Sequence, residues 1–150
     1  MSRPLETAFE SVYTKFKLNF YRRIFQRLDA REASLTTMEA YCVEIINALG
    51  TPTVSEFAKF VNISVANATY KVQSLTKKGY LRKERSEEDR RESHLHLTER
   101  FYDYQRLNTS YMATVVDRIE KHFPPEDIAI FQHVLDTISN ELMPEIELGY

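Results

Sequence analysis

The chain has 150 residues, 43% of them hydrophobic, so it can bury one core, and we expect a single domain over residues 1–150. Its one cysteine, Cys42, excludes an intramolecular disulfide and favours a reducing compartment, the cytoplasm. The first residues lack the apolar core of a signal peptide, and no stretch approaches the roughly 18 apolar residues of a membrane helix, so we expect no membrane partner.

Charge is distributed unevenly along the chain. The net charge is −2, but residues 64–100 hold nine Lys/Arg against six Asp/Glu, which gives +3. Residues 101–150 hold three against nine (−6), and residues 1–63 hold eight against seven (+1). The segment 64–100 would therefore attract an anionic partner, whereas the C-terminal third would repel phosphate. Taken alone, this pattern is explained equally well by chance variation on a solvated surface.

The first sixty residues are predicted to form three helices. The first is long and amphipathic, and its apolar stripe holds Phe9, Val12, Tyr13, Phe16, Phe20 and Ile24. A second helix starts after Thr36, which can cap it together with Glu39, and ends at Gly50. Thr53-Val54-Ser55-Glu56 repeats this start signal for a short helix. That helix ends at Asn62, because asparagine tolerates the left-handed conformation of a tight turn.

A fourth helix and a β-hairpin are predicted next. Ser64 caps the helix, which runs to Lys78, and Gly79 follows its C-cap. The face predicted to meet the core holds Ala68, Val72 and Leu75. The face toward solvent or DNA holds Ala66, Asn67, Thr69, Tyr70, Gln73 and Lys77. Two short strands, over residues 80–85 and 93–97, flank a polar segment and form a wing.

The C-terminal third is predicted to hold two more helices. Thr98 can cap a long helix, whose apolar stripe holds Leu107, Tyr111, Val115 and Ile119. Pro124 and Pro125 interrupt that helix. A final helix then follows, and its apolar face holds Ile128, Phe131, Leu135, Ile138 and Leu142.

The predicted fold class is mainly α with a small β-hairpin wing. We expect a winged helix-turn-helix over about residues 35–100, flanked by N- and C-terminal dimerisation helices over about residues 5–30 and 101–148. The terminal helices carry more large apolar residues than a single helix could bury away from solvent, which favours an isologous homodimer. A monomeric bundle that buries the same stripes internally is the alternative.

This order of elements predicts binding to double-stranded DNA. The candidate DNA-binding residues are Ser55, Ser64, Asn67, Thr69, Tyr70, Lys71, Gln73, Arg90 and Arg91. Amide side chains such as Asn67 and Gln73 can read adenine, serines at helix starts can hold phosphate, and the arginines can enter a narrow minor groove. For each residue alone, the alternative is ordinary solvation, helix capping or a weak surface ion pair with Asp89.

A family resemblance rests on the same residues. The segment from Ile63-Ser64 to Lys77-Lys78-Gly79-Tyr80-Leu81, followed by Asp89-Arg90-Arg91 and His94-Leu95-His96-Leu97-Thr98, resembles the MarR family of winged helix-turn-helix transcriptional regulators. The Ser-Glu-x-Asp-Arg-Arg wing and the His-Leu-His-Leu-Thr strand are similar in particular to the FabT type of fatty-acid-synthesis repressor. The chain departs from the family pattern at Phe101, where many members have glycine, and at Lys71, where an apolar residue is common.

The resemblance implies a homodimeric repressor that binds a pseudopalindromic operator and is released by a small ligand. It places Asn67, Thr69 and Tyr70 at base-facing positions of the recognition helix, and Arg90 and Arg91 in the wing. The FabT type further implies a small apolar or acyl effector, held in a cavity that the aromatic-rich first helix can line. Core packing explains those aromatic residues equally well.

Other functions have less support. Glycine occurs only at positions 50, 79 and 149, which excludes a dinucleotide loop and a P-loop, and no paired catalytic acid and base is recognisable, so we expect no enzyme and no cofactor. We expect no metal, although His94 and His96 could share one with His122 or His133. Redox sensing by Cys42 is a further alternative. The rival function is a winged-helix protein-interaction module that does not read DNA, which the acidic C-terminal third would suit.

Overall fold

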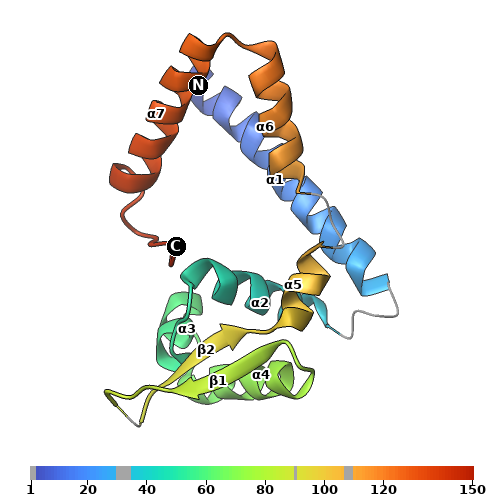
Figure 1. The fold of residues 1–150 in the computed structure, drawn as a ribbon, viewed down its shortest axis with the longest axis vertical. Coiled ribbons are helices and arrows are strands. Elements are labelled where there is room, and N and C mark those ends of the chain that lie inside the picture. Colours follow the sequence, from blue (N-terminus) through green and yellow to red (C-terminus); the bar gives the residue numbers. More distant parts are fainter. Residues whose placement is uncertain (1–2, 30–34, 90, 107–109) are drawn as a thin grey trace. The chain divides into compact units, whose positions relative to one another are not determined.

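The computed structural model describes residues 3–29, 35–89, 91–106 and 110–150, and these form two compact units (Figure 1). The terminal-helix unit consists of Met1–Arg23 and Asn108–Glu147. The winged-helix unit consists of Ile24–Leu107 and Leu148–Tyr150.

The winged-helix unit contains the predicted helix-turn-helix and wing. Its elements in chain order are α2 (Thr37–Leu49), α3 (Val54–Val61), α4 (Val65–Lys77), β1 (Leu81–Arg85), β2 (Ser93–Leu97) and α5 (Glu99–Arg106). The two strands pair antiparallel, from Leu81 opposite Leu97 to Arg85 opposite Ser93. The mainly helical fold with a hairpin wing is therefore confirmed, and the first strand begins one residue later than predicted.

The predicted helix starts are confirmed by hydrogen bonds. Thr36 caps α2 and Thr53 caps α3, each in a full capping box with a glutamate three residues on. Asn62 ends α3 in the left-handed conformation, with φ 58° and ψ 51°, and Ser64 caps α4 by accepting the Asn67 N–H. These groups satisfy backbone donors that a helix leaves without partners at its first turn.

A Schellman motif ends α4. The N–H of Gly79 donates to the carbonyl of Thr76, and the N–H of Tyr80 donates to the carbonyl of Leu75. Gly79 has a φ of +85°, which glycine adopts without the strain that a side chain brings, so its predicted place after the C-cap is confirmed. The Tyr80 side chain is then directed into the core, where it is 1% exposed.

One core lies beneath α4 and the hairpin. It is formed by buried side chains of every element in this unit, including Val43, Ile46, Phe57, Ala68, Val72, Leu75, Tyr80, Leu95 and Phe101. Phe101, which departs from the family pattern, is completely buried there. The hydroxyl of Thr98 donates to the carbonyl of Gly79 at 2.5 Å, and its own carbonyl accepts the N–H of Phe101. The buried side chain of Phe101 thus holds the start of α5 against the core of the winged-helix unit.

The prediction of one long helix after Thr98 is wrong. The structure has α5, which ends at Arg106, and a separate α6 (Tyr111–His122). Ser110 has an extended backbone, with φ −61° and ψ 116°, and its hydroxyl caps α6 by accepting the N–H of Ala113. Cap-forming polar residues compete for backbone hydrogen bonds in a helix interior, and a run of them precedes Tyr111. Leu107, predicted to begin the stripe, lies outside the described residues.

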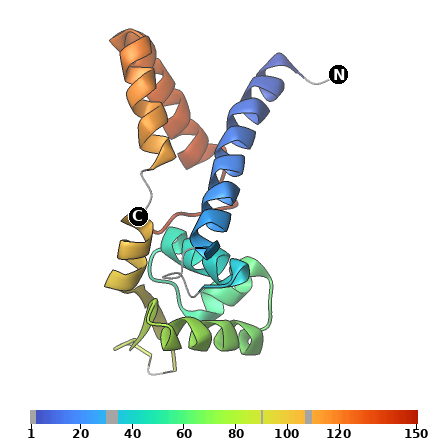
Figure 2. The ribbon, with the colours of Figure 1, turned by 90° about the vertical axis from the view of Figure 1, so that its right-hand side faces the viewer.

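The terminal-helix unit contains α1 (Pro4–Asp29) up to Arg23, together with α6 and α7 (Pro125–Glu141). Figures 1 and 2 show α6 and α7 side by side, connected by a short turn at the prolines. No residue of α6 or α7 is buried. Large apolar residues that are at least 40% exposed include Leu5, Phe9, Val12, Tyr13, Met112, Ile130, Phe131, Val134, Leu135 and Leu142. None of the described helices is long and apolar enough to cross a membrane.

We predict that Gly79→Ala lowers the free energy of unfolding of the winged-helix unit by about 1 kcal/mol, because a Cβ at positive φ is strained. Space is available, since an added Cβ would meet only the flexible Arg100 side chain at 3.6 Å. Gly79→Asn is the matched control and should cost less, because asparagine tolerates this conformation better. Urea unfolding monitored by circular dichroism measures both variants, and an equal cost for the two would contradict this explanation.

Candidate nucleic-acid interface

The face of α4 opposite the core is open to solvent in the winged-helix unit. Ala68, Val72 and Leu75 are completely buried and therefore fix which side of the helix is turned outward. The exposed residues of α4 beyond its first residue are Ala66, Asn67, Tyr70, Gln73, Thr76 and Lys77. In Figures 1 and 2, α4 lies along the lower edge of this unit. An exposed helix of this size fits a major groove of duplex DNA.

The candidate residues of α4 have different environments. Asn67, Tyr70 and Gln73 are exposed, and the Tyr70 side chain is the most accessible of these, at 74%. Thr69 is half-buried, and its hydroxyl donates to the carbonyl of Val65 at 2.8 Å. Lys71 is half-buried, and its charge acts on Cys42. The structure thus brings three of the five candidates to the outward face of α4.

Lys71 acts on the buried thiol of Cys42. Burial raises the pKa of Cys42, the positive charge of Lys71 opposes this, and the negative charge of Glu39 adds to the rise. The net result is a pKa above the ordinary value of 9.0. Cys42 is therefore a neutral thiol in the core at physiological pH, which is the behaviour of a small hydrophobic residue.

The two candidate serines lie at helix starts. The Ser64 hydroxyl accepts the Asn67 N–H at 3.1 Å, so this side chain acts as a helix cap. Ser55 is exposed in the first turn of α3, where a helix N-terminus favours an anion. In general, the first backbone N–H groups of a helix can donate to phosphate oxygens.

The wing turn is held by its own polar side chains. The Asp89 carboxylate accepts the backbone N–H of Arg91 at 2.9 Å, and the Ser86 hydroxyl accepts the N–H groups of Glu88 and Asp89. Asp89 thus positions Arg91 through its backbone, which leaves the exposed guanidinium at the tip of the hairpin. Arg90 lies outside the described residues.

Three further cations on the wing were not among the sequence candidates. Arg82 is paired with Glu84, and Lys83 and Arg85 are exposed on β1. A basic residue on a short strand gives no signal in the sequence that distinguishes a phosphate contact from a solvated charge. Pairing with β2 is what places Lys83 and Arg85 near the wing turn.

Glu39 connects α4 to the start of α2. One carboxylate oxygen accepts the Thr36 N–H at 3.0 Å and the Lys78 ammonium at 2.7 Å, and the other accepts the Ser74 hydroxyl at 3.0 Å. Ser74 and Lys78 belong to the last turn and the C-cap of α4. Because the Glu39 side chain is only 11% exposed, this ion pair is screened less by solvent than a surface pair.

The pKa of Glu39 reflects this arrangement. Burial alone raises it, but hydrogen bonds from Lys78, Thr36 and Ser74 stabilise the ionised form more strongly. The net pKa lies below the ordinary value of 4.5. The carboxylate is therefore charged at physiological pH and holds the end of α4.

The wing histidines have specific partners. The His94 ring lies with Nδ1 2.9 Å from the carbonyl of Thr51, and the His96 Nε2 lies 3.2 Å from the Glu84 carboxylate, which also pairs with Arg82 at 3.3 Å. Across the residues that the structure describes, no group of three or more His, Cys, Asp or Glu side chains is arranged to hold a metal ion.

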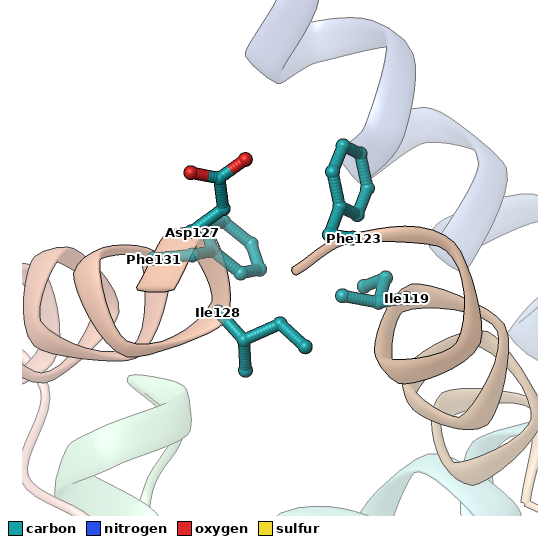
Figure 3. A pocket seen from close by; sticks show the side chains of 5 residues that line it. All are labelled: Ile119, Phe123, Asp127, Ile128 and Phe131. Atoms are coloured by element: carbon teal, nitrogen blue, oxygen red, sulfur yellow. The ribbon is translucent and has the colours of Figure 1, made fainter. Parts of the chain in front are cut away.

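A second candidate site lies in the terminal-helix unit, at the corner between α6 and α7. It is a pocket of about 310 Å³ lined by Ile119, Phe123, Asp127, Ile128 and Phe131. Figure 3 shows the apolar side chains of both helices facing one another, with the Asp127 carboxylate at the rim. Its size reaches the lower end of the range of small-molecule pockets. It is formed by α6 and α7, whereas the first helix was the predicted lining.

Comparison with known proteins places the fold. Residues 35–93 match the family model described as MarR family. The chain is similar in structure to FabT of Streptococcus pneumoniae, solved in complex with DNA, with 24% identity, a TM-score of 0.61, and coverage of 92% of this chain and 96% of that one. No curated protein sequence matches the chain.

Two other structural relatives have the same fold. A MarR-like transcriptional regulator from Thermotoga maritima is 22% identical, with a TM-score of 0.57 and coverage of 95% of this chain and 98% of that one. A mutant of MepR from a multidrug resistant clinical isolate of S. aureus is 11% identical, with a TM-score of 0.62 and coverage of 95% and 100%. At these identities the similarity establishes the fold.

We predict that Glu39→Ala lowers the free energy of unfolding by about 2 kcal/mol at pH 7, because a cap and a charged hydrogen-bond network are lost together. Since the pKa of Glu39 is lowered on folding, its contribution is complete above about pH 4.5 and is lost as the pH falls through the folded pKa. Urea unfolding between pH 7 and pH 3 measures this. The difference between the two proteins should shrink in acid.

The matched control is Glu10→Ala, which removes an exposed carboxylate of α1. Its free energy of unfolding should equal that of the unaltered protein throughout this pH range. Glu39→Gln should lie between the two variants, because the amide oxygen can still accept from Thr36 but no longer pairs with the Lys78 charge. A Glu39→Ala deficit that stays constant down to pH 3 would refute a role for the ionised carboxylate.

Proposed function

Residues 35–93 match the MarR family model, and from this premise we propose that the chain is a member of that family and acts as a homodimeric repressor on a pseudopalindromic operator. In this proposal the chain is a DNA-binding transcriptional regulator and not an enzyme. The observation that carries the proposal is the orientation of α4. Its apolar face is completely buried, whereas Asn67, Tyr70 and Gln73 are exposed and available to base edges.

The wing supplies a second contact in this proposal. The Arg91 guanidinium at the hairpin tip enters the narrow minor groove beside the major groove that α4 occupies, with Arg90 next to it in sequence. Backbone N–H groups at the starts of α3 and α4, with Ser55 and Ser64, hold phosphates and set the register. Non-specific attraction comes from the +3 charge of residues 64–100.

The homodimer is supported by the terminal helices. No residue of α6 or α7 is buried, although both helices carry large apolar side chains. In the proposed dimer a second copy of the chain buries this apolar surface. Charge agrees with such packing. Residues 3–23 hold five Lys/Arg against two Asp/Glu, whereas residues 110–147 hold two against eight. Pairing α1 of one protomer with α6 and α7 of its partner therefore brings opposite charges together.

Dimer symmetry sets the operator geometry. Two copies of α4 enter successive major grooves about 34–36 Å apart, which requires two half-sites related by a twofold axis. Repression follows if this operator overlaps a promoter. Release by a small apolar or acyl effector is supported by the apolar pocket between α6 and α7, because a ligand held there touches the helices that set the spacing of the dimer.

The alternative function is a protein-interaction module that keeps the winged helix without reading DNA. The −6 charge of residues 101–150 favours it. A gel-shift titration of the protein against the region upstream of its own gene, at several salt concentrations, separates the two functions. Saturable, sequence-dependent shifts support the regulator, and the absence of any shift in dilute buffer supports the interaction module.

We predict that Arg91→Ala weakens operator binding and lowers the slope of log K against log salt by about 0.9, because one protein cation fewer at the DNA surface releases one counterion fewer. Fluorescence anisotropy with a labelled duplex at 50 to 200 mM salt measures the slope. Lys121→Ala removes an equal charge from α6 and is the matched control, for which affinity and slope should be retained. Full affinity and an unchanged slope in Arg91→Ala would exclude the wing contact.

We predict that Ile130→Glu converts the dimer to monomer, because it places a charge on an apolar side chain of α7 that is 64% exposed in the single chain. Sedimentation equilibrium measures the change in mass, and operator affinity should fall with it. Met38→Glu alters an apolar residue of α2 that is similarly exposed, at 56%, and should leave the mass of the dimer unchanged. A monomeric unaltered protein, or a dimeric Ile130→Glu variant, would argue against this interface.

A further inference from the structure

The exposed face of α4 changes in character along its length. Near its C-terminus the face is polar, with Gln73 and Lys77 exposed. Its first two turns expose the polar Asn67 but also Val65, at 54%, the methyl group of Ala66, and the aromatic ring of Tyr70, at 74%. A soluble helix normally presents polar side chains on its solvent face, so an apolar surface here requires an explanation.

The polar candidates in this half of α4 are partly engaged within the protein. The Thr69 hydroxyl hydrogen is donated to the carbonyl of Val65, and Ser64 caps the helix through the Asn67 N–H. These hydroxyl groups consequently have less hydrogen-bonding capacity for a base edge. Beside the exposed amide of Asn67, the first two turns therefore offer the apolar surface of Val65, Ala66 and Tyr70 to a ligand.

Only one base offers an apolar group in the major groove of DNA. Thymine carries a C5 methyl group there, whereas cytosine, adenine and guanine present only donors, acceptors or hydrogen at the corresponding edges. Ala66 and Tyr70 are four residues apart, about 6 Å along the helix axis. That separation corresponds to about two base-pair steps of 3.4 Å. The basic surroundings of α4, +3 over residues 64–100, favour a polyanion as the occupant of this surface.

We propose that Val65, Ala66 and Tyr70 form an apolar reading patch for thymine methyl groups, so that each operator half-site carries thymines opposite the first two turns of α4. This inference rests on the proposed function, because the patch reads bases only if α4 enters the major groove. Specificity then arises from two kinds of contact along one helix. Methyl groups are read by the N-terminal half of α4, and hydrogen-bonding edges are read by Asn67 and Gln73.

The test removes the methyl group alone. Duplexes bound by the full-length protein are first selected from a random pool, and the best duplex is then synthesised with deoxyuridine in place of each half-site thymidine in turn. Deoxyuridine lacks the C5 methyl group but pairs in the same way. We expect affinity to fall about fourfold for each contacted methyl group, the fold-change for one buried methylene-sized group. Fluorescence anisotropy provides the dissociation constants.

Protein variants then test whether the loss of affinity for deoxyuridine duplexes depends on the reading patch. Tyr70→Ala and Val65→Ser should bind the thymidine and deoxyuridine duplexes with the same affinity at the positions they contact, since the alanine side chain is too short to reach the methyl group and the serine side chain carries no methyl group. Met38→Ala, which alters an exposed apolar residue of α2, is the matched control and should keep the full preference for thymidine. All three residues are exposed, so thermal unfolding should show that each variant folds as the unaltered protein does.

Failure of the reading patch and failure of the proposed DNA-binding function give different results. If the protein selects a duplex tightly but binds its deoxyuridine forms equally well, or selects half-sites without thymine, the reading patch is overturned and the DNA-binding function stands. A preference for thymidine that persists undiminished in Tyr70→Ala and Val65→Ser also overturns the patch. If the protein selects no duplex from the pool even at low salt, both the patch and the proposed function fall.

Discussion

The position of α4 depends on the hydrogen bonds and the ion pair that the Glu39 carboxylate makes. This carboxylate caps the start of α2 through Thr36 and holds the end of α4 through Ser74 and Lys78. Its net pKa is lowered although burial opposes this, so the hydrogen bonds to the ionised form outweigh the cost of desolvation. An α4 fixed at this end by charge, and along its inner face by Val72 and Leu75, turns one defined side outward.

The two units bury their apolar side chains to different degrees. The winged-helix unit has a completed core, with Phe57, Leu95 and Phe101 completely buried. In the terminal-helix unit, α6 and α7 bury no residue. In the proposed dimer the second unit therefore gains its core only by association, and its stability depends on protein concentration. The proposed effector would act on that dimer by altering the packing of α6 and α7.

Prediction from the sequence succeeded where a signal was local. The stripe of Ala68, Val72 and Leu75 identified the buried face of α4, and the alternation around Leu95 identified the second strand. It failed after Thr98, where the apolar spacing continued through a polar run and suggested one long helix. The cap at Ser110 overrides that spacing, because its hydroxyl satisfies the N–H of Ala113 and a new helix begins.

The sequence by itself determined where most helices begin and end, since Thr36, Thr53, Ser64 and Gly79 act on backbone groups within about four residues of themselves. Only the tertiary structure decided which side chains of α4 remain free. Lys71 is half-buried and its charge opposes the rise that burial causes in the pKa of Cys42, and Lys78 is paired with Glu39, which lies 39 residues earlier. Helix packing sets such contacts, and no local spacing rule encodes them.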